Sequence, residues 1–177
     1  GKTGLISHLF ASIPEKEAYC IYVDLYKTSC LREFVECLAK SVVGNCGSPS
    51  LREKIIQALQ SLRFSFSSDP ITGTPEIGVS IVEAQSEISL QQIFDYMEHA
   101  DKPVYIALDE FQQIQYYPEV KIEETLRTYI QHLRNTHFIF AGSQKHMMMD
   151  MFSSAKRAFY QSAQTMHIGT IPENEYY

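Results

Sequence analysis

Apolar residues recur along this chain at two spacings, and segments with one spacing alternate with segments of the other. Apolar positions three or four residues apart, which mark one face of a helix, predict helices. Short continuous apolar runs predict strands that are buried on both faces, as in a parallel sheet. The helical spacing follows Lys2 as far as Pro14 and returns in residues 31–43, 50–62, 89–97, 122–133 and 147–152, with Ser50 and Ser89 as expected N-caps. The strand-like runs are residues 19–23, 104–108 and 138–141, and residues 165–168 are the candidate for a last strand.

Residues 64–82 depart from this alternation. Residues 64–67 and 77–81 alternate apolar with polar side chains, and turn-forming residues lie between them. This pattern predicts an antiparallel hairpin with one solvated face, inserted into the main fold at about residues 64–82. Strands that alternate with helices predict an α/β fold, here a three-layer α/β/α sandwich with a mostly parallel sheet.

Composition narrows the class of protein. The 177 residues are 45% hydrophobic and 20% charged, which is typical of one globular domain, and no apolar run is long enough to cross a membrane. The net charge of -6 argues against a general nucleic-acid coat but leaves a local basic patch open. Cys20, Cys30, Cys37 and Cys46 contain no C-x-x-C pair, so we expect free thiols rather than zinc ligands, which suits a reducing cytoplasm. The six histidines form no metal motif, and we assign them no catalytic role.

Two adjacent acids follow the apolar run 104–108 directly. The carboxyl ends of parallel strands are where α/β sheets bind ligands, so Asp109 and Glu110 are expected at such a site. Paired carboxylates repel each other unless a cation or a proton compensates. We interpret Asp109 as a Mg²⁺ ligand that acts through water, and Glu110 as the general base that polarises an attacking water. The alternative is that both acids cap the turn after the strand.

The chain opens on Gly1-Lys2-Thr3, which matches the end of the phosphate-binding loop G-x-x-x-x-G-K-[ST]. In such a loop the backbone N–H groups and a helix N-terminus hold the phosphates, the lysine contacts the β and γ phosphates, and the threonine hydroxyl lies on Mg²⁺. Gly1, Lys2, Thr3 and Gly4 are therefore the candidate nucleotide-binding residues, with Thr3 also a candidate metal ligand. An ordinary tripeptide or a tag remnant is the alternative interpretation.

Two further segments carry weaker signals. Ser143 or Gln144, at the end of the run 138–141, is expected to sense the γ-phosphate by hydrogen bonding, or else to be a simple turn residue. Lys156 and Arg157 offer a positive charge for the transition state, although a solvated surface pair is the favoured interpretation.

Three motifs together resemble the archaeal-type ATPase family, within the STAND group of P-loop NTPases and the wider branch that includes AAA ATPases. They are the opening Gly-Lys-Thr, the run Ile-Ala-Leu-Asp-Glu-Phe-Gln at 106–112, and Phe-Ala-Gly-Ser at 140–143. Similar proteins of Bacteroides-type bacteria share this layout. The resemblance covers essentially the whole chain, includes the hairpin, and implies ATP and Mg²⁺ as ligands.

Residues 156–163 resemble a later block of the same family, usually Arg-Pro-Phe/Leu-Tyr-Gly-Arg. Here Ala158 stands in place of the proline, and Gln161 and Ser162 stand in place of Gly-Arg. An arginine role carried over from that block is therefore not supported by these residues.

Two functions remain in competition at this point. The first is a cytoplasmic ATPase core in which nucleotide drives a conformational change in a larger protein with C-terminal accessory domains. The second is a non-hydrolysing interaction or regulatory scaffold, with DNA association as a variant that needs a basic face. We expect one core domain over residues 1–177, cut at both ends, because the strand before Gly1 is missing and residues 172–177 lack a closing element. On this view the parent protein binds Mg-ATP, whereas the isolated fragment binds nucleotide poorly.

Overall fold

The computed structural model describes residues 1–45, 49–70 and 72–169, without the side chains of 49–52 and 54. Helices and strands alternate along the chain as the apolar spacing predicts, and η marks a short 3-10 helix. In order the elements are α1 (Lys2–Ser12), β1 (Tyr19–Asp24), α2 (Leu31–Gly44), α3 (Pro49–Ala58), β2 (Arg63–Ser68), β3 (Pro75–Ser80), η1 (Glu83–Gln85), α4 (Ser86–Glu98), β4 (Val104–Asp109), η2 (Phe111–Tyr116), α5 (Ile122–Ile130), β5 (Thr136–Phe140) and α6 (Lys145–Ser153).

The centre of the fold is a parallel sheet of β1, β4 and β5, with β4 in the middle. The register aligns Tyr22 with Ala107 and Asp24 with Asp109. Parallel neighbours require a crossover connection. Helices α2, α3 and α4 lie in the connection from β1 to β4, and α5 lies in the connection from β4 to β5. All three strands therefore end at one edge of the sheet, which carries the acids.

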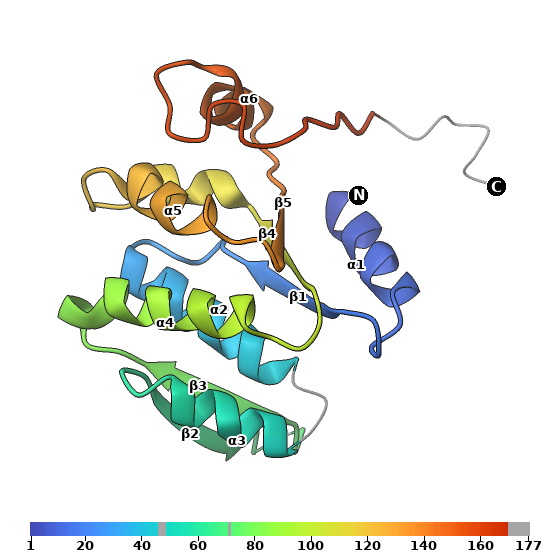
Figure 1. The fold of residues 1–177 in the computed structure, drawn as a ribbon, viewed down its shortest axis with the longest axis vertical. Coiled ribbons are helices and arrows are strands. Elements are labelled where there is room, and N and C mark those ends of the chain that lie inside the picture. The colour runs from blue at the N-terminus through green and yellow to red at the C-terminus, as the bar shows by residue number, and fades with distance from the viewer. Residues whose placement is uncertain (46–48, 71, 170–177) are drawn as a thin grey trace.

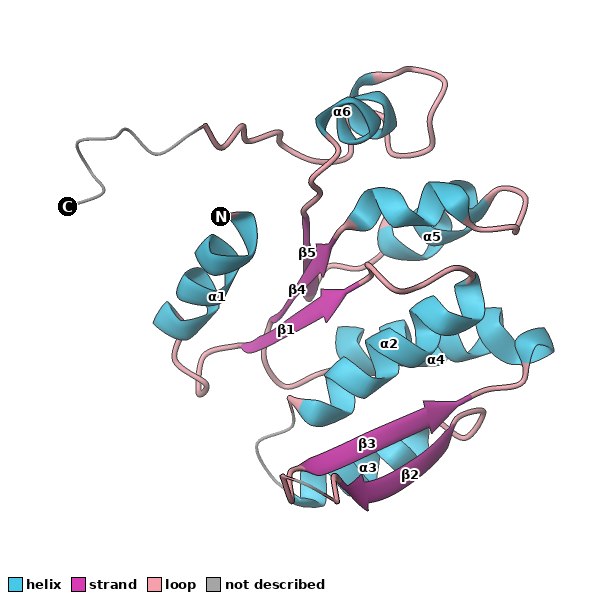
Figure 2. Cartoon of the chain, turned by 180° about the vertical axis from the view of Figure 1, so that it is seen from behind, coloured by secondary structure: helices cyan, strands magenta, loops and turns pink. Residues whose placement is uncertain are grey.

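Helices cover both faces of this sheet, so the predicted α/β/α layering is confirmed (Figure 1). Alternate strand residues such as Val23, Ile106 and Leu108 face the main core, which they share with α2, α4 and α5. The intervening residues face α1, which is the helix on the opposite face in the described part of the chain (Figure 2). That second core is small, with Ile6, Ala107 and Ala141 as its buried members.

The predicted hairpin is also confirmed. Strands β2 and β3 pair antiparallel over residues 63–68 and 75–80. The hairpin lies outside the parallel sheet beside α2 and α3 (Figure 2). Ile77, Val79 and Ile81 pack against the main core, while Phe66 on the other strand is exposed. The hairpin therefore extends the core rather than the sheet.

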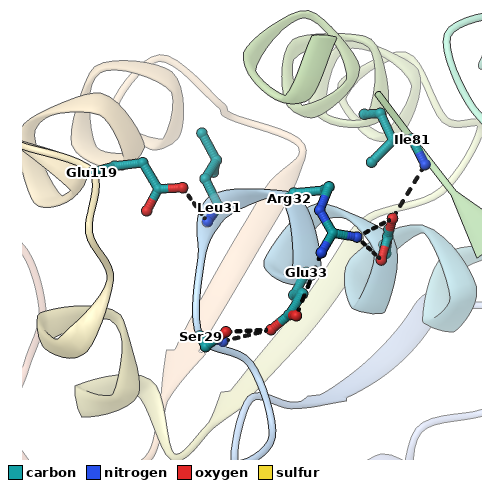
Figure 3. A network of polar contacts seen from close by, with 7 residues as sticks. Ser29, Leu31, Arg32, Glu33, Ile81 and Glu119 are labelled. Carbon is teal, nitrogen blue, oxygen red and sulfur yellow. Dashed lines mark hydrogen bonds and ion pairs between the residues drawn. The ribbon is translucent and has the colours of Figure 1, made fainter. Parts of the chain in front are cut away.

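Polar contacts fix the start of α2 and tie the hairpin to it (Figure 3). Glu33 accepts hydrogen bonds from the backbone N–H and the hydroxyl of Ser29, both at 2.8 Å. A backbone N–H just before the start of α2 thus has a partner. Glu119 accepts from the N–H of Leu31 at 2.8 Å, from a distant part of the chain. A third carboxylate, that of Glu36, joins Arg32 at 3.1 Å and accepts from the N–H of Ile81 at the end of the hairpin.

Several predictions about boundaries are wrong. Ser50 and Ser89 lie inside α3 and α4, so neither is an N-cap, and α3 ends at Ala58 rather than near residue 62. The segment after the acids forms the 3-10 helix η2, in which Phe111 and Ile114, three residues apart, are buried. Residues 165–168 form no strand. The reason is exposure: Met166 and Ile168 are 79% and 48% exposed, so no apolar face fixes the segment against the sheet. Residues 172–177 lie outside the described residues.

Within the part of the chain that the structure describes, no helix combines the length and the apolar character needed to cross a bilayer.

Candidate functional site

Strand β4 delivers Asp109 and Glu110 to the edge of the sheet, as the sequence predicts. Asp109 is the last residue of the strand and is 5% exposed. Its backbone carbonyl still accepts a hydrogen bond from the N–H of Leu25 at 3.1 Å, which holds the strand end against the loop after β1. The carboxylate is thus a buried negative charge at a fixed position, and such a charge needs partners.

Two hydroxyl groups from different elements donate to one oxygen of Asp109. The Thr3 hydroxyl, on the first turn of α1, lies 2.8 Å from Oδ2. The Tyr22 hydroxyl, on β1, lies 2.7 Å from the same atom. The other oxygen, Oδ1, accepts from the N–H of Glu110 at 3.0 Å. Three neutral donors therefore orient the carboxylate, and no cationic side chain of the described residues pairs with it.

Tyr22 reaches Asp109 because of the strand period. Side chains two residues apart share a face, so Tyr22 lies on the α1 side of the sheet together with Asp24. Its ring packs beside the small side chains of Ala107 and Ala141. Burial raises the pKa of Tyr22 to about 12, and the hydrogen bond to Asp109 adds to the rise. The phenol is therefore protonated, and a donor, at neutral pH.

Glu110 turns the chain away from β4. Its φ of 54° and ψ of 39° lie in the left-handed region, which costs a non-glycine residue about 1–2 kcal/mol. The N–H of Phe111 compensates by donating to the carbonyl of Ala141 at 2.9 Å, so the turn is fixed to the end of the neighbouring strand. Backbone strain of this kind is typical of functional sites.

The Glu110 carboxylate is held by two side-chain donors. Its Oε2 accepts from the Ser143 hydroxyl at 2.6 Å and from Nε2 of Gln112 at 2.5 Å. Gln112 is 1% exposed, and its Oε1 has no hydrogen-bond partner among the described residues. Gly142 leaves the space for this amide, because a Cβ there would come within 2.2 Å of Gln112 Oε1.

The structure places the predicted phosphate-binding residues at the start of α1. Gly1 is the N-cap, Lys2 and Thr3 open the helix, and Gly4 completes the first turn. All four are exposed, and no ion pair or hydrogen bond joins the Lys2 side chain to another described residue. A helix N-terminus with free N–H groups attracts anions, so the exposed turn suits phosphate.

The remaining candidates are not brought to the acids. Gln144 is exposed at the N-cap of α6, and Lys156 is exposed. Arg157 forms an ion pair and hydrogen bonds with Glu123 and lies 3.1 Å from Asp150. Burial raises the pKa of Glu123 despite Arg157, which lowers it in part. Arg157 thus links α5 to α6.

A divalent cation fits the donor set around Asp109. Mg²⁺ prefers oxygen ligands and is commonly held by one or two carboxylates plus phosphates of the substrate. Thr3 donates its proton to Asp109 and keeps its lone pairs for a cation, while the buried carboxylate has no cationic partner among the described residues. No group of three or more His, Cys, Asp or Glu side chains able to hold a metal occurs in the described part of the chain.

Sequence reasoning missed Tyr22 and the part played by Gln112. A signal for Tyr22 was available, because it lies two residues before Asp24 and so shares the face that ends in an acid. No local signal marks Gln112, since its burial depends on Gly142 from another strand end.

Comparison with known proteins supports the fold alone. No family model and no curated protein matches the chain. The ORC2 protein of Aeropyrum pernix, solved as ADPNP-ADP complexes, is 12% identical, with a TM-score of 0.50 over 89% of this chain and 34% of that one. The Walker-type ATPase paby2304 of Pyrococcus abyssi is 17% identical, with a TM-score of 0.49 over 90% and 43%. The chain therefore spans less than half the length of either protein, and what it shares with the ORC2 protein is the α/β fold.

Proposed function

We propose that this chain is the core of an archaeal-type P-loop ATPase of the STAND group, in which Mg-ATP binding and hydrolysis switch the state of a larger protein. The observation that carries this proposal is the hydrogen bond of 2.8 Å between Thr3 and Asp109. These residues lie 106 positions apart and come from the two motifs that together define a nucleotide-triphosphate site. The ADPNP and ADP of the ORC2 structure agree with a nucleotide at such a fold.

The residues have separate roles on this proposal. Gly1, Lys2, Thr3 and Gly4 hold the phosphates through the first turn of α1, and Ser143 contacts the γ-phosphate. Thr3 and Asp109 hold Mg²⁺, which neutralises charge that develops on the phosphate oxygens. Glu110 accepts a proton from water as the water oxygen bonds to the γ-phosphorus and the bond to the leaving ADP breaks.

The decisive experiment is Glu110→Gln in the natural protein that contains these residues. An amide cannot accept the proton, so we expect ATP to bind with unchanged affinity and turnover to fall by at least about a hundredfold, the usual size of general-base catalysis. Binding is measured with a fluorescent ATP analogue and turnover by phosphate release. Retained turnover would refute the assignment of the base.

A matched variant separates the ATPase from the scaffold hypothesis. Glu124 is an acid on α5 outside the proposed site, so Glu124→Gln should leave turnover unchanged. If the unmodified protein binds Mg-ATP but shows no turnover, the fold serves as a nucleotide-dependent scaffold. If it binds no nucleotide under any condition, the proposed function is wrong.

A further inference from the structure

We infer that Tyr22 is a positioning residue for the metal site, which acts by holding the Asp109 carboxylate; the inference rests on the proposed function. The starting observation is the hydrogen bond of 2.7 Å from the Tyr22 hydroxyl to Asp109 Oδ2. None of the motifs that define the site includes this tyrosine. It belongs to β1, and it reaches the site through sheet register alone.

The geometry makes this contact specific. Tyr22 is aligned with Ala107, two residues before Asp109 on the neighbouring strand. Its side chain therefore lies on the same face of the sheet as the Asp109 carboxylate. The methyl side chains of Ala107 and Ala141 leave room for the ring, and Ile6 of α1 contributes to the same small core. The Tyr22 hydroxyl therefore donates to Asp109 Oδ2 from β1, while the Thr3 hydroxyl donates to the same oxygen from α1.

The choice of donor matters for a cation. A lysine or arginine at this place would neutralise Asp109 and compete with a metal for it. A phenol donates one hydrogen bond and adds no charge, so it orients the carboxylate and leaves the negative charge available. No cationic side chain pairs with Asp109 among the described residues. Outer partners that orient a ligand in this way typically contribute 10- to 100-fold in metal affinity.

The test is Tyr22→Phe, which removes the hydroxyl and keeps the ring. We measure Mn²⁺ binding to the complex with a non-hydrolysable ATP analogue by electron paramagnetic resonance. Because one of the three hydrogen bonds to the Asp109 carboxylate is lost, we expect about tenfold weaker Mn²⁺ binding. Binding of the analogue without metal should be unchanged, and the Mg²⁺ concentration for half-maximal turnover should rise while kcat at saturating Mg²⁺ stays within about twofold.

Tyr105→Phe is the matched control. Tyr105 lies on β4, four residues before Asp109, where its ring stacks on His137. The substitution removes the same hydroxyl group from the same sheet face at a place that does not contact Asp109, so Mn²⁺ affinity should not change. Thermal unfolding of both variants checks that each is folded.

The outcomes separate this inference from the proposed function. Weaker Mn²⁺ binding in Tyr22→Phe but not in Tyr105→Phe supports it. Equal Mn²⁺ affinity in Tyr22→Phe and the unmodified protein overturns it and leaves the ATPase proposal intact. If the unmodified protein binds neither nucleotide nor Mn²⁺ with nucleotide, the proposed function fails first. If Tyr22→Phe is unfolded, Tyr22→Leu provides a second apolar variant without a hydroxyl. About tenfold weaker Mn²⁺ binding in that variant then supports the inference, whereas affinity equal to that of the unmodified protein overturns it.

Discussion

The two faces of the parallel sheet differ in how they are held. On one face, α2 and α4 pack many fully buried side chains against the strands, among them Phe34, Leu38 and Ile93. On the other face lies α1 (Figure 1). It contributes Ile6 as its buried residue, while Leu5 and Leu9 are 49% and 45% exposed. One face therefore provides most of the apolar burial, and the other carries the candidate site.

This difference indicates that the residues that stabilise the sheet and the residues of the candidate site lie on different faces. Apolar burial contributes roughly 1.5–3 kcal/mol for each large side chain, so the main core can hold the sheet without help from α1. Helix α1 is placed by a few apolar contacts and by the hydrogen bond from Thr3 to Asp109. A helix held by so little can respond to a ligand at its N-terminus without disturbing the core.

The largest effect is expected from the main core. Phe34 is fully buried in α2, and Phe34→Ala should lower the free energy of unfolding by about 3–5 kcal/mol because it removes a large side chain and leaves a cavity. Urea unfolding followed by circular dichroism measures the change. Phe66→Ala in the hairpin is the control, since Phe66 is 57% exposed and should cost well under half as much. Equal losses in both variants would contradict the division between core and surface.

An isoleucine on each face provides the sharpest comparison. Ile93 of α4 is fully buried in the main core, whereas Ile6 of α1 is buried in the small one. We expect Ile93→Ala to cost about 4 kcal/mol and Ile6→Ala about 2 kcal/mol, the upper and lower parts of the range for such truncations. The reason is that fewer atoms surround Ile6, so fewer contacts are lost. The same urea experiment decides, and a larger loss for Ile6→Ala would reverse the assignment of the two faces.

Elements whose own apolar spacing decides their structure could be predicted from the sequence. The apolar runs at 19–23 and 104–108 and the helical spacing at 31–43 were sufficient to predict β1, β4 and α2, because each element buries its own apolar pattern. Residues 165–168 alternate polar with apolar side chains, as a strand can, and still form no strand, since Met166 and Ile168 face solvent. Local alternation does not reveal whether a neighbouring strand is available.

The candidate site also combines residues that the sequence identifies with residues that only the fold identifies. Asp109, Glu110 and Thr3 could be singled out because motifs place chemistry at fixed positions along the chain. Gln112 could not be assigned with them, because its role depends on the space that Gly142 leaves. For Tyr22 the strand period indicated the face, but the contact with Asp109 depends on the register of β1 on β4. Motifs therefore name the residues proposed to contact the ligand, and the fold supplies the residues that orient them.

The smallest effect on stability is expected at the edge of the sheet, where Gly142→Ala tests whether site and core are independent. The added Cβ would come within 2.2 Å of Gln112 Oε1 and 2.7 Å of Met148 Sδ, so both side chains must shift. Because these are side-chain ends rather than backbone, we expect a loss of about 1 kcal/mol, at the low end for overpacking. Gln112 can no longer hold Glu110 in place, so turnover should fall about tenfold.

Gly78→Ala controls for the overpacking itself. A Cβ at Gly78 would come within 2.3 Å of the Ser65 hydroxyl, a similar clash in the hairpin, far along the chain from the acids. We expect a comparable loss in urea unfolding and no change in phosphate release. If both glycine variants lose stability equally and only Gly142→Ala loses turnover, the sheet edge serves the chemistry separately from the core. If Gly142→Ala retains full turnover, the contact between Gln112 and Glu110 does not orient the base, and Ser143 remains as the side-chain donor that holds it.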